Sequence, residues 1–357
     1  RLTRRKLLQG TGTAIGLSAM ARVLPGFSAT SSSQQLKAAG YRFPRTEALF
    51  TGALNPPGLE LHFEQAGIGD INTDVFSGKQ SWDVCEIGLH PFMLAYANDE
   101  FRDYSLIPVY PIRVFRHKSI FIRNDRGIEK PEDLVGRKVA TPGYSSTSLT
   151  WIRGMLKDEY GVKPSDIEWV YSRKDSSSAE AGMISAQENV FPKDISISPG
   201  PAGKDESELL LDGDVDALFH AAQPKAFVEG HPQVARLFPD SREVEKDSYR
   251  RTGIFPIMHA VAVRKKLLDA DETLAGKLFQ AYSQAKQRAY QYNVRLGWGA
   301  NMLPWYSQEL EATWAVMGRN FYSYGLPGNR KVLDTLCSYS HDQGLSSREL
   351  TVEVLFH

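Results

Sequence analysis

A turn rich in hydroxyl groups, at residues 141–148, follows a predicted strand and opens a predicted helix at 149–160. Hydroxyl side chains cap the first turn of a helix, and the unpaired amide groups there attract negative charge. The pattern therefore indicates a site for a carboxylate, with ordinary helix capping as the alternative. It lacks the GxxxxGKS or GxxxxGKT pattern of a nucleotide phosphate loop. Its candidate ligand-binding residues are Tyr144, Ser145, Ser146 and Thr147.

A second candidate is a cluster of basic side chains at 113–118, in a segment expected to be extended. Alternate residues of a strand share a face, which would place Arg113 and His117 together, with Phe115 between them. Arg116 and Lys118 would then face the other way. An arginine beside an aromatic ring suits a benzoate-like ligand, because guanidinium binds carboxylate bidentately and the ring stacks. The alternative is a hinge strand whose charges are solvated.

Other candidates lie near the ends of further predicted strands. Arg45 and Thr46 belong to the first predicted strand-to-helix loop and are candidate ligand contacts. Glu86 could accept hydrogen bonds from phenolic hydroxyls or pair with an arginine, and a structural ion pair is the alternative. His220 and His259 could each donate a proton near neutral pH, so they are the catalytic candidates if the chain is an enzyme. Structural roles are the alternative for both histidines.

Several functional classes lack their usual motifs. No HxxxH, HExxH or carboxylate cluster points to a metal, no GxSxG elbow is present, and no cofactor motif is visible, so neither a metal nor a cofactor is expected. Cys85 and Cys337 lack CxxC spacing and are expected to be buried thiols, with their pairing left open. The 42 basic and 42 acidic residues balance, which argues against binding of nucleic acid.

The elements that must position these residues alternate between short strand-like runs and amphipathic helical stretches. This alternation predicts an α/β fold with mainly parallel sheets. The predicted strands include 59–64, 82–87, 119–123, 138–141, 167–171 and 215–220, and the predicted helices include 69–77, 149–160, 207–212, 271–291 and 307–317.

Two segments, 108–123 and 253–263, are predicted to cross between two α/β lobes. Two crossings form a hinge, and the cleft between the lobes is the predicted ligand site. The first lobe would comprise residues 34–115 plus 258–340, the second lobe 116–257, and a tail packing on the first lobe 341–357.

Residues 1–33 are predicted to be an export signal with a spacer. Arg4 and Arg5 form a twin-arginine pair before a weakly apolar stretch from Gly10 to Ala21. That stretch is too short, and too rich in Gly, Thr and Ser, to span a bilayer. The signal predicts export of the folded chain to the periplasm or another extracytoplasmic compartment, without stable membrane insertion.

Strings spread over nearly the whole chain after this signal resemble 4,5-dihydroxyphthalate decarboxylases and related substrate-binding proteins of the type II periplasmic class. The strings are Phe115-Arg116-His117, Trp151-Ile152-Arg153-Gly154, Asp166-Ile167-Glu168-Trp169, the run from Arg251 to His259, Leu303-Pro304-Trp305, Tyr324-Gly325, Asn329-Arg330 and Gln343-Gly344-Leu345-Ser346. The resemblance implies a bilobal type II periplasmic-binding-protein fold with an aromatic or related carboxylate between the lobes. For the decarboxylases of this family, the resemblance also implies a reaction in which the substrate loses a carboxyl group as carbon dioxide.

Two functions follow from these observations. The first is an exported solute-binding protein that captures a small anionic, aromatic carboxylate for an ABC-type membrane transporter. The alternative is a carboxy-lyase that releases carbon dioxide from a hydroxylated aromatic dicarboxylate. The export signal favours binding, because a catabolic decarboxylase is expected inside the cell.

Overall fold

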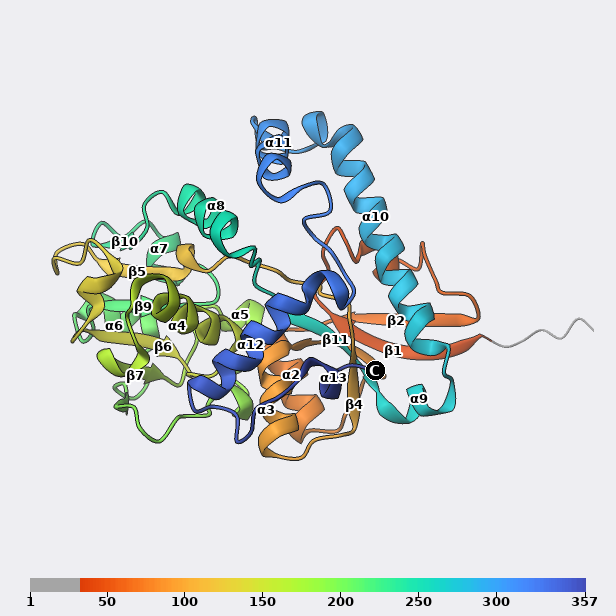
Figure 1. Ribbon diagram of the computed structural model, residues 1–357, viewed down its shortest axis with the longest axis horizontal. Helices are drawn as coiled ribbons and strands as arrows, with labels where there is room; N and C mark the ends of the chain where they lie inside the picture. The colour runs from red at the N-terminus through yellow and green to blue at the C-terminus, as the bar shows by residue number, and fades with distance from the viewer. Residues whose placement is uncertain (1–32) are drawn as a thin grey trace, which may run out of the picture. The chain divides into compact units, whose positions relative to one another are not determined.

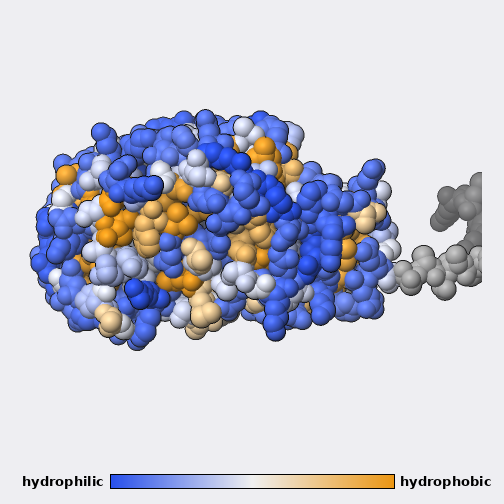
Figure 2. All heavy atoms as spheres, turned by 90° about the horizontal axis from the view of Figure 1, so that it is seen from below, coloured by the Kyte–Doolittle hydropathy of each residue, from blue (hydrophilic) through white to orange (hydrophobic). Residues whose placement is uncertain are grey.

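The computed structural model describes residues 33–357, so the predicted export signal lies almost entirely outside the described residues. Residues 33–357 form one compact unit with two β-sheets and helices packed on their faces (Figure 1). This arrangement confirms the predicted α/β class. No helix in the described range has the length and apolar character needed to cross a membrane. The face drawn in Figure 2 is mainly hydrophilic, with apolar side chains gathered along its middle.

The first sheet has five strands in the order β2-β1-β3-β11-β4. Their bounds are β1 (Gln34–Gly40), β2 (Leu59–Gln65), β3 (Val84–Gly88), β4 (Tyr104–Ile107) and β11 (His259–Arg264). Strand β1 runs parallel to β2 and β3, whereas β11 is antiparallel to β3 and β4. Strand β11 therefore returns the chain, late in the sequence, to the centre of a sheet begun by its first strands.

The second sheet has six strands in the order β10-β5-β9-β6-β7-β8. Their bounds are β5 (Ile120–Arg123), β6 (Lys138–Pro142), β7 (Glu168–Ser172), β8 (Ile197–Pro199), β9 (Ala217–Phe219) and β10 (Val234–Arg236). Strands β6 to β9 pair in parallel, and β5 is antiparallel to both β9 and β10. The predicted limits of the two lobes and of the tail stay predictions.

Thirteen α-helical segments accompany the sheets in the described residues. Their bounds are α1 (Glu47–Phe50), α2 (Ile68–Ser77), α3 (Leu89–Asn98), α4 (Thr147–Tyr160), α5 (Ser178–Ala181), α6 (Glu206–Asp212), α7 (Lys225–Val228), α8 (Ser241–Thr252), α9 (Lys265–Ala270), α10 (Leu274–Ala300), α11 (Tyr306–Met317), α12 (Arg330–Asp342) and α13 (Val352–Leu355).

Helix α4 is well specified by its own residues. Ser146 is its N-cap and accepts a hydrogen bond from the Leu149 amide at 3.4 Å, and Gly161 ends the helix in the left-handed conformation. Its apolar side chains, including Ile152 and Leu156, are buried in the core of the second sheet. Burial of that face fixes the direction of the helix, and with it the position of its first turn.

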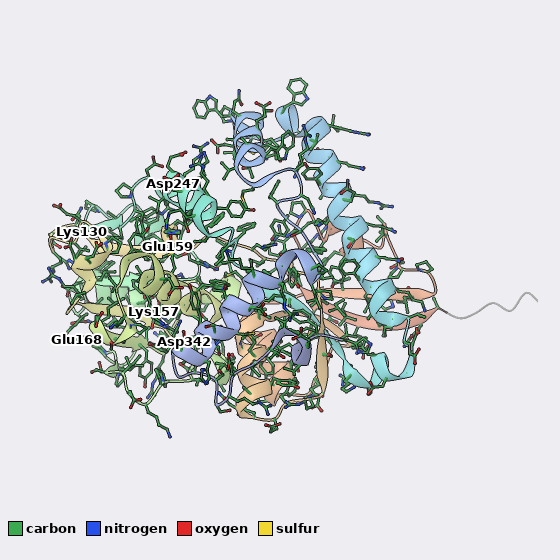
Figure 3. All side chains as sticks on the ribbon, viewed as in Figure 1. Lys130, Lys157, Glu159, Glu168, Asp247 and Asp342 are labelled. Atoms are coloured by element: carbon green, nitrogen blue, oxygen red, sulfur yellow. The ribbon has the colours of Figure 1, made fainter. Side chains whose placement is uncertain are left out.

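The C-terminal residues pack against both halves of the fold. The ring of Tyr339 on α12 fills the space beside Gly154 on α4, where any side chain would overlap it. Lys157 on α4 and Asp342 on α12 form an ion pair of 3.3 Å and are labelled in Figure 3. Phe356 forms an isolated parallel bridge with Leu106 of β4. The chain end therefore links the helix that opens the predicted anion site to the first sheet.

The expectation that residues 113–118 form an extended segment is wrong. Arg113 forms only an isolated bridge with Ile257, residues His117–Ser119 form a 3₁₀ turn, and β5 begins at Ile120. Arg116 has helical backbone angles and the turn follows it, so the alternation that would place Arg113 and His117 on one face is broken.

Candidate functional site

A cavity of about 610 Å³ lies between loops that follow strands of the two sheets. Its volume is within the range of small-molecule sites. From the first sheet come Tyr41 and Phe43, the start of α2, and His259 at the start of β11. From the second come the start of α4 and the loops that follow β7 and β9. The cavity is therefore built from ends of elements, where unpaired backbone groups and polar side chains face the interior.

Arg116 is the buried cation of the cavity wall. Its side chain is 4% exposed, and its Nη1 donates to the Ala221 carbonyl at 2.6 Å and to Ser119 Oγ at 3.3 Å. Within residues 33–357, no carboxylate lies within 4.0 Å of the guanidinium. Burial lowers its pKa to about 9, and the more distant Glu245 only partly opposes this effect. A buried charge without a counter-ion is destabilising, so an anion in the cavity would be stabilised there.

The first turn of α4 adds a second source of positive potential. Ser146 and Ser148 both line the cavity. The helix has fourteen residues, and its amino end carries a partial positive charge from the unpaired amides. Arg116 and this helix end thus both favour a negatively charged ligand.

His259 lines the cavity and forms a pair with Glu86. His259 Nδ1 lies 2.5 Å from Glu86 Oε1, and the second carboxylate oxygen accepts the Tyr41 amide at 3.1 Å. The Tyr41 ring stacks on the imidazole with centroids 6.1 Å apart. Because Nδ1 is held by the carboxylate, Nε2 is the nitrogen that can exchange a proton with a molecule in the cavity.

A polar cluster under the same cavity joins Asp175, Glu206 and His220. His220 Nε2 lies 3.0 Å from Asp175 Oδ1 and 3.2 Å from Glu206 Oε1. No sequence motif indicates this cluster, because its members come from three separate segments. Only the fold brings these three side chains together.

The cluster has the donor types of a metal site, since one ligand atom from each residue lies within 4.8 Å of the others. The Ala222 amide, however, donates to His220 Nδ1 at 2.9 Å. A metal-bound histidine usually donates a hydrogen bond from its second nitrogen, whereas His220 Nδ1 accepts one from the Ala222 amide. Burial alone would lower the pKa of His220, but the hydrogen bonds to Asp175 and Glu206 raise it to about 10, so a proton on Nε2 holds Asp175 at the cavity wall.

A loop of the second sheet closes the cavity against the first. Residues 175–184 follow β7, and the Met183 amide donates to Asp70 Oδ1 at 3.1 Å at the start of α2. Tyr41 Oη donates to the Glu180 carbonyl at 3.2 Å. Gly69 permits this contact, because an added Cβ would overlap the Met183 carbonyl oxygen. The contact between this loop and α2 therefore requires glycine at position 69.

Two of the eleven predicted site residues, Ser146 and His259, line the cavity, and Glu86 contacts His259 directly. His220 lies behind the wall and reaches the cavity only through Asp175. Thr46 lies in the turn after β1, where its hydroxyl bonds the carbonyls of Tyr41 and Phe43.

The predicted arginines and His117 have other partners. Arg113 Nη1 donates to Asn329 Oδ1 and its Nη2 to the Phe255 carbonyl, both at 2.7 Å, so this side chain joins the segment before β11 to the segment before α12. Arg45 bonds the Pro111 carbonyl. His117 is buried beside Phe238, outside the cavity lining.

Three residues of the hydroxyl-rich turn face the protein interior. Tyr144 packs edge-on against Trp169 and under the Arg153 guanidinium. Ser145 Oγ donates to the Gln187 carbonyl at 2.7 Å. Thr147 Oγ1 accepts the His90 amide at 3.0 Å. This turn therefore contributes Ser146, Ser148 and the helix end to the cavity.

Sequence reasoning missed Arg116, Tyr41 and Asp175 as cavity residues. Arg116 belongs to one of the strings that carry the family resemblance, and Tyr41 belongs to the same loop as the predicted Arg45, so both lay within segments already singled out. Asp175 had no such signal, because only the fold brings it to His220.

Buried neutral histidines predict a loss of stability in mild acid. Burial, together with Arg251 and Lys118, lowers the pKa of His117 to about 4, against 6.5 for an ordinary histidine. The unfolded chain then binds more protons than the folded chain between these values, so stability falls as pH drops from about 6.5 to 4. His117→Leu is expected to remove up to about 2 kcal/mol of this loss in urea unfolding at pH 7.5, 6 and 5. His341→Asn, at an exposed helix end, should leave the slope unchanged, and an equal effect of both variants would contradict the assignment.

Known proteins resemble this chain in sequence. The family model described as NMT1/THI5 like matches residues 104–187. The 4,5-dihydroxyphthalate decarboxylase of Comamonas testosteroni is 35% identical over 327 residues, which cover 91% of this chain and 97% of that protein. The enzyme of the same name from Pseudomonas putida is 35% identical over 169 residues, 47% of this chain and 64% of that protein.

Solved structures resemble it in fold. The periplasmic aliphatic sulphonate binding protein of Escherichia coli matches with a TM-score of 0.52 and 14% identity, covering 90% of this chain and 97% of that chain. A periplasmic sulfonate-binding protein of Methylobacillus flagellatus matches with a TM-score of 0.54 and 14% identity, covering 91% and 92%. At this identity the likeness establishes the fold alone, and it confirms the predicted bilobal periplasmic-binding-protein architecture. By the extent of its sequence match, the chain belongs to the 4,5-dihydroxyphthalate decarboxylase family.

Proposed function

We propose that this protein binds a small aromatic carboxylate in the cavity between its two sheets and delivers it for uptake. The observation that carries the proposal is Arg116, a buried cation on the cavity wall with no carboxylate within 4.0 Å in residues 33–357. A ligand carboxylate at this wall would pair with the guanidinium and with the amino end of α4.

The rest of the cavity suits an aromatic ring that carries hydrogen-bond donors. Tyr41, Phe43 and Ile112 offer apolar surface for the ring. Asp175, held by His220, offers an acceptor for a phenolic hydroxyl. A hydroxylated benzoate or phthalate combines these features. Delivery to an ABC-type transporter outside the cytoplasm is part of the proposal and is supported by the twin-arginine segment and the fold.

Decarboxylation is the second candidate, and the pair His259 and Glu86 favours it. In such a reaction the bond between ring carbon and carboxyl carbon breaks, carbon dioxide leaves, and the electron pair stays on the ring carbon. A proton from His259 Nε2 would then complete the product, and Glu86 would stabilise the positively charged imidazole before that transfer. The relative from Comamonas testosteroni carries the name of such an enzyme.

One experiment separates the two functions. The full chain is mixed with 4,5-dihydroxyphthalate and with benzoate, while heat of binding and released carbon dioxide are measured separately. A binding protein gives saturable heat without carbon dioxide, and His259→Gln changes its affinity by less than about tenfold. A decarboxylase releases carbon dioxide, and His259→Gln slows that release by at least about 100-fold while binding persists. Absence of saturable heat with any aromatic carboxylate would contradict the proposed ligand class.

A further inference from the structure

The connection between α10 and α11 exposes large apolar side chains. The exposed fractions are 55% for Leu296, 74% for Trp298, 97% for Met302, 64% for Leu303 and 71% for Trp305. These five residues, named here the hairpin tip, fall within ten positions of the sequence. Figure 1 shows this end of the two helices far from both sheets. Single exposed apolar residues are common, but five large ones within ten positions indicate an interaction surface.

The hairpin tip is held by ordered packing on both sides. The first half of α10 is anchored in the core of the first sheet by Leu278 and Tyr282, among others. Near the tip, Gly297 lies against the Tyr306 ring, where an added Cβ would be 2.6 Å from a ring carbon. Arg242 on α8 pairs with Glu309 on α11 at 2.9 Å. The apolar side chains are thus presented on a fixed scaffold, as an interface requires.

We propose that the hairpin tip is the contact surface for a second copy of this chain, related to the first by a two-fold axis. Five side chains of this size, exposed to this extent, offer on the order of 600–800 Å² of apolar surface, close to the roughly 800 Å² that each partner contributes to a standard interface. Aromatic residues and methionine are enriched in the centres of such interfaces.

The unpaired charges beside the hairpin tip are complementary in a two-fold contact. In a two-fold contact the same surface meets itself, so antiparallel hairpins place α10 of one chain beside α11 of the other. Arg295 on α10 and Glu311 on α11 have no ion-pair partner within 4.0 Å in residues 33–357, whereas Glu309 is already paired with Arg242. Arg295 of each chain would therefore face Glu311 of its partner.

Sedimentation velocity of the full chain, over a range of micromolar concentrations, tests the proposal. The mass obtained from sedimentation is expected to be twice that of the monomer. The double variant Trp298→Glu/Met302→Glu should weaken self-association at least about 100-fold, because it places like charges in the centre of the contact. Val135→Glu is the matched control, since Val135 is 55% exposed in another part of the fold. It should leave the mass unchanged.

Oxidative crosslinking gives an independent readout. Cys85 and Cys337 are both buried, so a new thiol at the hairpin tip would be the reactive one. Met302→Cys is expected to form an interchain disulfide, and Val135→Cys is not. A chain that stays monomeric, or a dimer that survives the double variant, overturns the proposal. So does a monomer that sediments with anionic vesicles, which would assign the tip to a membrane.

Discussion

Replacing Arg116 by methionine is expected to weaken binding of a hydroxylated phthalate by about 2–4 kcal/mol, which corresponds to roughly 30- to 1000-fold. In the unliganded protein, removal of the buried charge is expected to offset the loss of the hydrogen bonds to the Ala221 carbonyl and Ser119 Oγ, so the unfolding temperature should change little. Affinity falls because the guanidinium is buried without a counter-ion in the described residues until an anion arrives. Methionine keeps much of the side-chain volume and removes the isolated charge.

Arg113→Met is the matched control, three positions earlier in the same basic cluster. Its guanidinium donates to Asn329 Oδ1 and to the Phe255 carbonyl, so its loss leaves buried acceptors without donors. We expect this variant to lose about 2–4 kcal/mol of stability and to keep its ligand affinity within about threefold. Calorimetry and thermal unfolding measure the two effects. The assignment of Arg116 is wrong if Arg113→Met loses affinity and Arg116→Met does not.

Gly69→Ala is expected to prevent the loop at 175–184 from docking on α2. The new Cβ would overlap the carbonyl oxygen of Met183, a backbone atom that no side-chain rotation can move away. Ligand affinity should fall at least about tenfold, because Gly182 and Met183 form part of the cavity wall. Hydrogen exchange at the Met183 amide should become faster, since its bond to Asp70 would be lost.

Gly276→Ala is the control for this substitution. Gly276 lies in α10 with no atom within 4 Å of an added Cβ, so alanine there should leave affinity unchanged and favour the helix slightly. Unchanged exchange at Met183 in Gly69→Ala would show that the loop does not depend on this close approach. Because hydrogen exchange needs no ligand, this result is independent of the ligand's identity.

Elements with strong local signals were predicted closely. The helix expected at 149–160 is α4, Thr147–Tyr160, and the helix expected at 307–317 is α11, Tyr306–Met317. The helix expected at 271–291 instead continues to Ala300 through Gly297. Glycine in a helix is locally unfavourable, so its tolerance here comes from packing against Tyr306, which no local pattern reveals.

The candidate site was predicted in part. The turn before α4 was located from its hydroxyl residues, yet of the four residues named there only Ser146 lines the cavity. His259 was identified as a proton donor candidate, and its partner Glu86 was named separately without any sign that the two meet. Their contact depends on the antiparallel pairing of β11 with β3, which joins segments far apart in the chain.

The amino-acid sequence by itself determined the α/β class, the helix caps, the balanced net charge and the family. These properties depend on residue type and on neighbours within a few positions, or on similarity along the whole chain. Only the tertiary structure decided that Arg116 faces the cavity while Arg113 binds carbonyl and amide oxygens. The two side chains carry the same group and are both buried, and their roles differ because the cavity and the hydrogen-bond partners come from distant segments that folding alone brings together.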